Sequence, residues 1–240
     1  MNIGSMDAAN ELGKKLIDDI IYIEWEMFQN VNEGKTRVDC QNNPQTFGAM
    51  RRAQFLAWSH DALASYLEDL KLAIVDKRNL LVEKYIYMMK YTEPHNYEIL
   101  RHTVPEPDEN VTRLAAKLVE KIMEQTTSLF KEFPYIASLG RPQFSAEDIS
   151  YITSLETYQR GEFVTYSEKT LSALSRHIDM LNRENVSFAG IIMENTVKTY
   201  GYPSLADANA AAKKHLEKIG HQMDCCVHCS TESKKNGRFF

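Results

Sequence analysis

The segment from Leu16 to Val31, LIDDIIYIEWEMFQNV, decides the fold predicted for this chain. At about 100° per residue, its apolar side chains form one broad face of an α-helix. They are Leu16, Ile17, Ile20, Ile21, Ile23, Met27, Phe28 and Val31. Glu24 lies on the same face, because Ile17, Glu24 and Val31 are spaced by seven residues and align within about 40°. A carboxylate facing a core is costly unless it meets a cation, hydrogen-bond donors, a metal or a proton, so Glu24 is the first candidate functional residue.

The composition is ordinary for a globular protein of 240 residues, with 43% hydrophobic and 25% charged residues. The net charge of −5 provides no basic field for nucleic acid or anionic lipid, and the apolar runs are too short to span a bilayer. The N-terminus, MNIGSMDAANELGKK, lacks the continuous apolar run of a secretory signal. Three of the four cysteines are close together, which does not suit a disulfide framework. We therefore expect a cytoplasmic protein that binds neither nucleic acid nor membrane.

Helical periodicity, capping residues and breaks predict an all-α fold, a bundle of roughly seven to nine helices. No alternating strand and no fixed-period repeat occurs. The expected domain organisation is a single compact domain over residues 1–220 and a flexible tail over 221–240 that contains Cys and His. The expected helices are Ala8–Val31, Pro44–Ile74, Leu80–Tyr91, Val111–Phe133, a helix from Ser145 to Glu162, a helix around Leu171–Leu181, Phe188–Tyr200, and Leu205–Ile219 closed by Gly220. Thr92–Asn110 is expected to be a long loop, and Gly161 a kink or break.

The second expected helix supplies a partner for Glu24. Arg51 lies four residues after Phe47 and four before Phe55, so it shares their inward face with Gln54. A guanidinium offers two parallel donors to a carboxylate, which makes Arg51 the natural counter-ion. We therefore predict that Glu24 and Arg51 are the core of a polar site, as acid/base or ligand anchor and as anion clamp. Further candidate ligand-binding residues are Gln54, Glu156, Arg160, Glu162 and Asn195. The alternative is a structural ion pair that fixes helix register.

In the third helix, Glu83 and Lys84 are expected on the side opposite the apolar stripe.

The C-terminal segment is a second candidate site. Cys225, Cys226, His228 and Cys229 include one Cys-x-x-Cys pair, which can bind zinc or another soft metal or cycle as a dithiol. Strong zinc motifs have two such pairs, so an exposed tail carrying thiols is the alternative. Cys40 is a weaker candidate nucleophile, with His95 or His102 as its base, since a lone loop cysteine is more often an apolar filler.

Several blocks of the sequence resemble one known family. They are LIDDIIYIEWEMFQNV, Cys40-Gln41, FGAMRRAQFLAW, NLLVEKYIYMMKYT, LETYQRGE and MENTVKTYGYPSLADA. Together they resemble a bacterial family known only as domain of unknown function 4125, over most of Leu16–Gly220. The resemblance implies a bacterial, cytoplasmic, helical protein and carries over no catalytic residues.

Two classes of function remain open from the sequence. The first is a domain, enzymatic or not, that binds or acts on a small polar ligand in a pocket containing Glu24 and Arg51. The second is a non-enzymatic interaction module with a structural polar core and a metal- or redox-active cysteine tail. The sequence names no substrate, reaction or protein partner.

Overall fold

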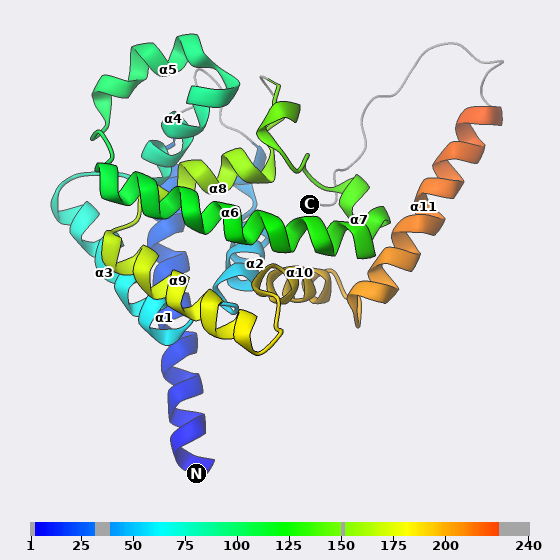
Figure 1. Ribbon diagram of the computed structural model, residues 1–240, viewed down its shortest axis with the longest axis horizontal. Helices are drawn as coiled ribbons and strands as arrows, with labels where there is room; N and C mark the ends of the chain where they lie inside the picture. Colours follow the sequence, from blue (N-terminus) through cyan, green and yellow to red (C-terminus); the bar gives the residue numbers. More distant parts are fainter. Residues whose placement is uncertain (1–2, 32–38, 150–151, 226–240) are drawn as a thin grey trace.

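The computed structural model describes residues 3–31, 39–149 and 152–225 of the chain (Figure 1). These residues form eleven α-helices and three short 3₁₀ helices, and their one β-type pairing is an isolated bridge between Ile149 and Ile152. The all-α prediction is confirmed, with more helices than expected. The α-helices are α1 (Ile3–Gln29), α2 (Pro44–Phe55), α3 (His60–Val75), α4 (Leu80–Thr92), α5 (Pro94–Leu100), α6 (Glu109–Glu132), α7 (Pro134–Leu139), α8 (Leu155–Phe163), α9 (Glu168–Arg183), α10 (Phe188–Thr199) and α11 (Leu205–Cys225). The 3₁₀ helices are η1 (Asp39–Asn42), η2 (Arg101–Thr103) and η3 (Ser145–Glu147).

The single helix predicted for Pro44–Ile74 is wrong, because the chain turns between α2 and α3. Ser59 is extended and caps α3, with its side chain accepting a hydrogen bond from the amide of Ala62 at 3.3 Å. The turn buries Ala57 and Trp58, which are 3% and 7% exposed. Burying the indole in the core favours this turn over a continuous helix.

Two other boundaries differ from the prediction. The expected loop Thr92–Asn110 contains α5, which begins at Pro94 and has no buried residue, followed by η2. The helix expected to begin at Ser145 begins only at Leu155, after η3. The carboxylate of Asp148 accepts the amide of Ser154 at 2.6 Å, and Ser154 in turn caps α8. This local hydrogen bonding competes with a helix that would run straight through.

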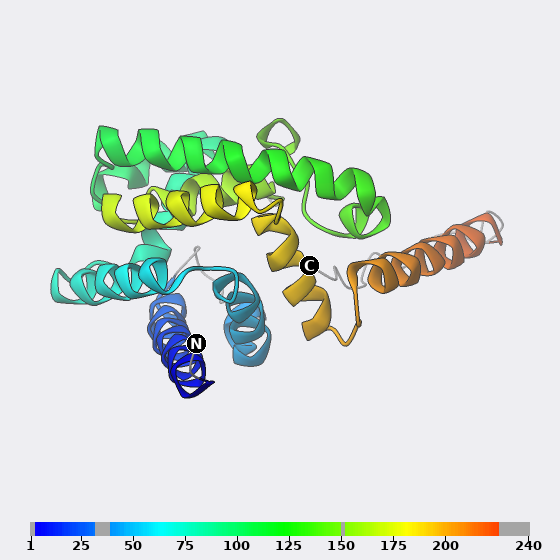
Figure 2. The ribbon, with the colours of Figure 1, turned by 60° about the horizontal axis from the view of Figure 1, so that its bottom comes forward.

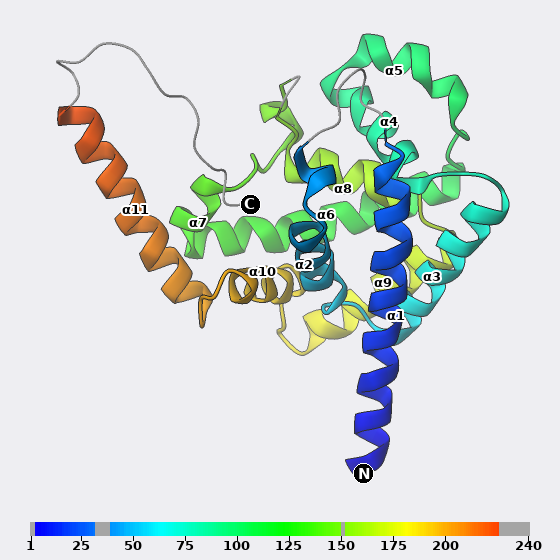
Figure 3. The same ribbon diagram turned by 180° about the vertical axis from the view of Figure 1, so that it is seen from behind.

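The helices pack in layers around a large principal core. Figure 2 shows α6 and α9 running side by side, with α1, α2 and α3 on one side of them. From behind, α1 and α2 lie in front of α6 and α8 (Figure 3). Helix α4 packs closely against α8, and α10 against α2. The largest fully buried side chains include Tyr66, Phe55, Ile20, Leu70 and Leu118. Segments far apart in sequence therefore meet around the C-terminal half of α1.

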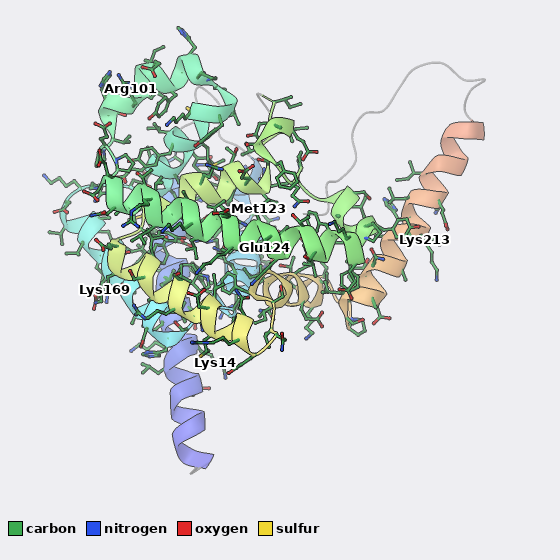
Figure 4. All side chains as sticks on the ribbon, viewed as in Figure 1. Lys14, Arg101, Met123, Glu124, Lys169 and Lys213 are labelled. Carbon is green, nitrogen blue, oxygen red and sulfur yellow. The ribbon has the colours of Figure 1, made fainter. Side chains whose placement is uncertain are left out.

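A second, smaller core joins α7, α10 and α11. Its buried residues are Ile136, Val197, Leu205, Ala208 and Ala212. Beyond this contact α11 leads away from the rest of the molecule, and Lys213 marks the middle of the helix in Figure 4. The helix continues through Gly220 to Cys225, so Gly220 does not end it as expected. Within the described ranges, no helix has both the length and the apolar character needed to cross a bilayer.

Candidate functional site

Glu24 lies inside the protein, as the helical pattern predicted. Its side chain, in the C-terminal half of α1, is fully buried. Three other charged side chains meet it or its partners: Arg51 from α2, Lys84 from α4 and Glu162 from α8. We call these four residues, with Gln54, Tyr66 and Tyr166, the charge cluster.

Arg51 binds Glu24 with two parallel hydrogen bonds. The guanidinium Nε donates to Oε2 of Glu24 at 2.7 Å, and Nη2 donates to Oε1. The hydroxyl of Tyr66 also donates to Oε1 of Glu24, at 2.7 Å. The guanidinium carbon of Arg51 lies 4.6 Å from the ring centre of Phe55, on the same helix. Glu24 therefore has the cation and the donors that its position required.

Glu162 links the same arginine to Lys84. Its Oε1 accepts hydrogen bonds from Nη1 of Arg51 at 2.9 Å and from the hydroxyl of Tyr166 at 2.6 Å. The side-chain amide of Gln54 donates a longer hydrogen bond to Oε1, at 3.2 Å. Its Oε2 accepts from Nζ of Lys84 at 2.6 Å. With two carboxylates and two cations, the cluster is electrically neutral in its fully ionised form, which limits the cost of burying the four charges.

Gly161 allows Glu162 to approach Lys84. A Cβ atom at position 161 would lie 2.5 Å from Cγ of Met88 and 2.8 Å from the carbonyl oxygen of Lys84. Only glycine lets the two backbones come this close without a shift. Contrary to the predicted kink, α8 runs as a regular helix through Gly161, and the reason for the glycine is the packing of α8 on α4.

Burial and the neighbouring charges shift the pKa values of three groups in the cluster. Burial alone would raise the pKa of Glu162, but the charges of Arg51 and Lys84 outweigh it and hold this pKa well below its usual range. Burial, together with the charge of Glu24, raises the pKa of Tyr66 well above its usual range. Burial and the charge of Glu162 do the same to the pKa of Tyr166. Near neutral pH these three groups therefore do not exchange protons easily.

A small cavity adjoins the cluster. It has a volume of about 20 Å³, which is room for about one water molecule. Its walls include Phe47, Leu81 and Tyr85, with Arg51 and Lys84 at the polar side. The Lys84 nitrogen lies 3.6 Å from the ring centre of Tyr158, which also lines the cavity. As it stands, the cavity does not hold a drug-sized ligand.

The structure brings together four of the predicted site residues: Glu24, Arg51, Gln54 and Glu162. It does not bring in Glu156, Arg160 or Asn195. Glu156 and Arg160 pair with each other at 2.6 Å on a partly exposed face of α8, since 100° per residue places Arg160 about 200° from Glu162. Asn195 donates to the backbone carbonyl of Ala53 at 3.1 Å, because α10 packs along α2.

The prediction missed Lys84, Tyr66 and Tyr166, and it placed Lys84 and Glu83 on the wrong side of α4. Both are buried, at 5% and 3% exposure. Helix α4 is covered on most sides, because α8 packs on the face that its own sequence left polar. Glu83 is paired there with Arg78 through two hydrogen bonds of 2.9 and 2.7 Å. The sequence signal for their burial was local composition, because Glu83 and Lys84 are flanked by Val82 and Tyr85.

The predicted cysteine site cannot be compared with the structure. Cys226, His228 and Cys229 lie outside the described residues, as does the side chain of Cys225. The side chain of Cys40 is also outside them, whereas His95 and His102 are exposed on α5 and η2. In Figure 4 this part of the chain, marked by Arg101, lies at the edge of the molecule, where α5 packs against α4. In the part of the chain that the structure describes, no three His, Cys, Asp or Glu side chains form a group able to hold a metal ion.

A family model described as "Protein of unknown function (DUF4125)" matches residues 14–210. The chain belongs to this family. The match contains every residue of the charge cluster and ends within α11. The family description assigns no activity and no residue role. Neither the curated proteins nor the solved structures gave a match.

Proposed function

We propose that this member of the DUF4125 family is a non-enzymatic interaction module, in which the charge cluster holds the helices in place. The observation that carries the proposal is the closed hydrogen bonding of the cluster. Every carboxylate oxygen of Glu24 and Glu162 accepts from an arginine, a lysine or a tyrosine. Three of its groups stay in one protonation state near neutral pH, which does not suit a general acid or base. The space beside them fits about one water.

A surface that suits a partner lies at the end of α3. Leu72, Ile74 and Val75 are 61%, 53% and 76% exposed. Leu72 and Val75 are three residues apart and share one face of the helix, whereas Ile74 points elsewhere. Neighbouring exposed apolar side chains are more typical of an interaction site than scattered single ones are. We therefore place the partner contact at this end of α3.

The test compares a surface variant with a core variant of the full chain. Cross-linking in cells, followed by quantitative mass spectrometry, measures partners of wild type, Leu72→Asp/Val75→Asp and Lys84→Met/Glu162→Gln. We expect a partner that is lost in the surface variant and retained in the core variant, provided that circular dichroism shows both folded. Equal recovery of all partners from wild type and the surface variant would contradict this contact.

The cavity beside Lys84 favours a second function, binding of a small polar ligand, as predicted from the sequence. Aromatic walls next to a buried cation are typical of small-molecule sites, although this cavity must open to admit more than a water. Native mass spectrometry of the purified chain tests it. A molecule that co-purifies with wild type and is absent from folded Lys84→Met/Glu162→Gln would favour this function over a structural cluster. The bare chain mass from both proteins would count against it.

A further inference from the structure

The second core contains a pocket that is separate from the charge cluster. It lies between α7, the end of α10 and α11, and has a volume of about 110 Å³. One wall is aliphatic and comes from Ile136 and Leu139 of α7. The facing wall consists of the methyl groups of Ala208, Ala211 and Ala212 on α11. Alanine side chains are too short to fill the space between the helices. A pocket therefore remains although α7, α10 and α11 are packed together.

The remaining lining residues are aromatic. Tyr200 and Tyr202 follow α10, and His215 lies one turn beyond Ala211 on α11. None of the described side chains that line the pocket is a carboxylate, a lysine or an arginine. His215 aside, a charged ligand would therefore lose its hydration without gaining a permanently charged partner, whereas a neutral ring can pack against tyrosine and alanine.

The volume of the pocket matches a ligand of about one ring. An apolar cavity of about 150 Å³ in another protein binds benzene, so about 110 Å³ suits a six-membered aromatic ring with little substitution. We propose that this pocket binds one small, neutral, monocyclic aromatic molecule.

Ligand binding would also stabilise the docking of α11. The buried residues of α11 are Leu205, Ala208 and Ala212, two of which are alanines and bury little area. Asn209 adds two hydrogen bonds, since its side-chain oxygen accepts the amides of Tyr135 and Ile136 at 3.0 and 3.2 Å. A ring that contacts α7 and α11 together binds the docked arrangement better than any undocked one, so it shifts the population toward docking.

The test adds fluorobenzene to the full chain. Fluorine NMR measures its binding, and hydrogen exchange measures the protection of the α11 amides. We expect saturable broadening of the fluorobenzene signal and slower exchange of the α11 amides by about threefold or more, as linkage requires. Benzoate has a similar ring with a negative charge and is expected to produce neither effect. The proposal is overturned if fluorobenzene binds no better than benzoate, or if no saturable binding occurs.

Two leucine substitutions locate the site. Ala212→Leu fills the pocket and is expected to weaken fluorobenzene binding at least about tenfold. Ala210→Leu adds the same side chain to an exposed position of α11 and is expected to leave binding unchanged. If Ala212→Leu does not fold, Ala211→Leu, at a half-buried lining position, replaces it. Equal binding by the filled and the control variants would place the ligand elsewhere and overturn the proposal.

Discussion

In the charge cluster, four ionised side chains from four helices are buried together, whereas in the second core a few small apolar side chains hold α11 against α7 and α10. Each contact in the cluster is directional and depends on the others: Arg51 bonds to both Glu24 and Glu162. Contacts in the second core are mostly non-directional, with directional ones at Asn209 and between Glu194 and the amide of Leu205. A buried charge left without its partner is costly, while a small apolar contact costs little when lost. The comparison therefore predicts that the cluster controls global stability and the second core controls local docking.

Arg51→Met should have the largest effect. It leaves Glu24 and Glu162 buried without their shared cation, which typically costs about 3–5 kcal/mol of unfolding free energy. Urea unfolding followed by circular dichroism measures it. The neighbouring Arg52→Met is the control, because Arg52 pairs with Asp18 on the surface and an exposed pair contributes about 0–1 kcal/mol. Similar losses for both variants would break the comparison.

The second largest effect on the unfolding free energy is expected at low pH. The pKa of Glu162 is depressed in the folded state, so its contribution is complete above the unfolded value of 4.5 and is lost as the pH falls below it. Unfolding free energies measured from pH 7 to pH 3 should therefore fall most steeply below about pH 4.5. Glu162→Gln should flatten this part of the curve. An unchanged slope in that variant would show that other carboxylates dominate.

Gly161→Ala should have an intermediate effect. The added methyl group would be 2.8 Å from the backbone oxygen of Lys84 as well as 2.5 Å from Cγ of Met88, so α8 and α4 must separate, at a typical cost of about 1–3 kcal/mol. Gly13→Ala is the matched control on α1, where nothing lies within 4 Å of the added atom. It should stabilise the helix by about 0.5–1 kcal/mol. Thermal unfolding compares the two, and stabilisation by both substitutions would contradict the close packing at Gly161.

The smallest effect is expected in the second core. Asn209→Ala removes the side chain that caps α7, which typically costs about 1 kcal/mol. The loss should be local, so hydrogen exchange should speed up in α7 and α11 while the amides of α1 and α4 keep their protection. Uniformly faster exchange across all helices would show that the second core is not an independent unit.

The sequence predicted those site residues whose orientation follows from the periodicity of their own helix. The periodicity of α1 places Glu24 toward the core, and that of α2 places Arg51 beside it; both positions follow from 100° per residue. Asn43, Asn79 and Ser187 are of the residue types that favour helix N-caps, and each accepts a hydrogen bond from an amide of its helix. Local geometry and capping chemistry are therefore readable from a single chain.

What the sequence did not predict depends on contacts between distant segments. Lys84 faces the core only because α8, more than seventy residues later, covers it. Asn195 has the polar character of a site residue, but the packing of α10 on α2 directs it to a backbone carbonyl. The break before α3 had a local signal, Ser59 as a cap, which the apolar pattern around it outweighed. Helix packing, rather than helix formation, limited the prediction.

A double-mutant cycle on Lys84 and Glu162 tests the structural role of the cluster most directly. Lys84→Met and Glu162→Gln should each destabilise the chain, and the double variant should be more stable than the sum of the two losses predicts, by about 0.5–3 kcal/mol. The exposed pair Lys169 and Glu68, 2.5 Å apart, is the matched control and should show little or no coupling, because water screens both charges. If the two losses at Lys84 and Glu162 simply add, with no more coupling than in the exposed pair, the cluster does not hold the fold together.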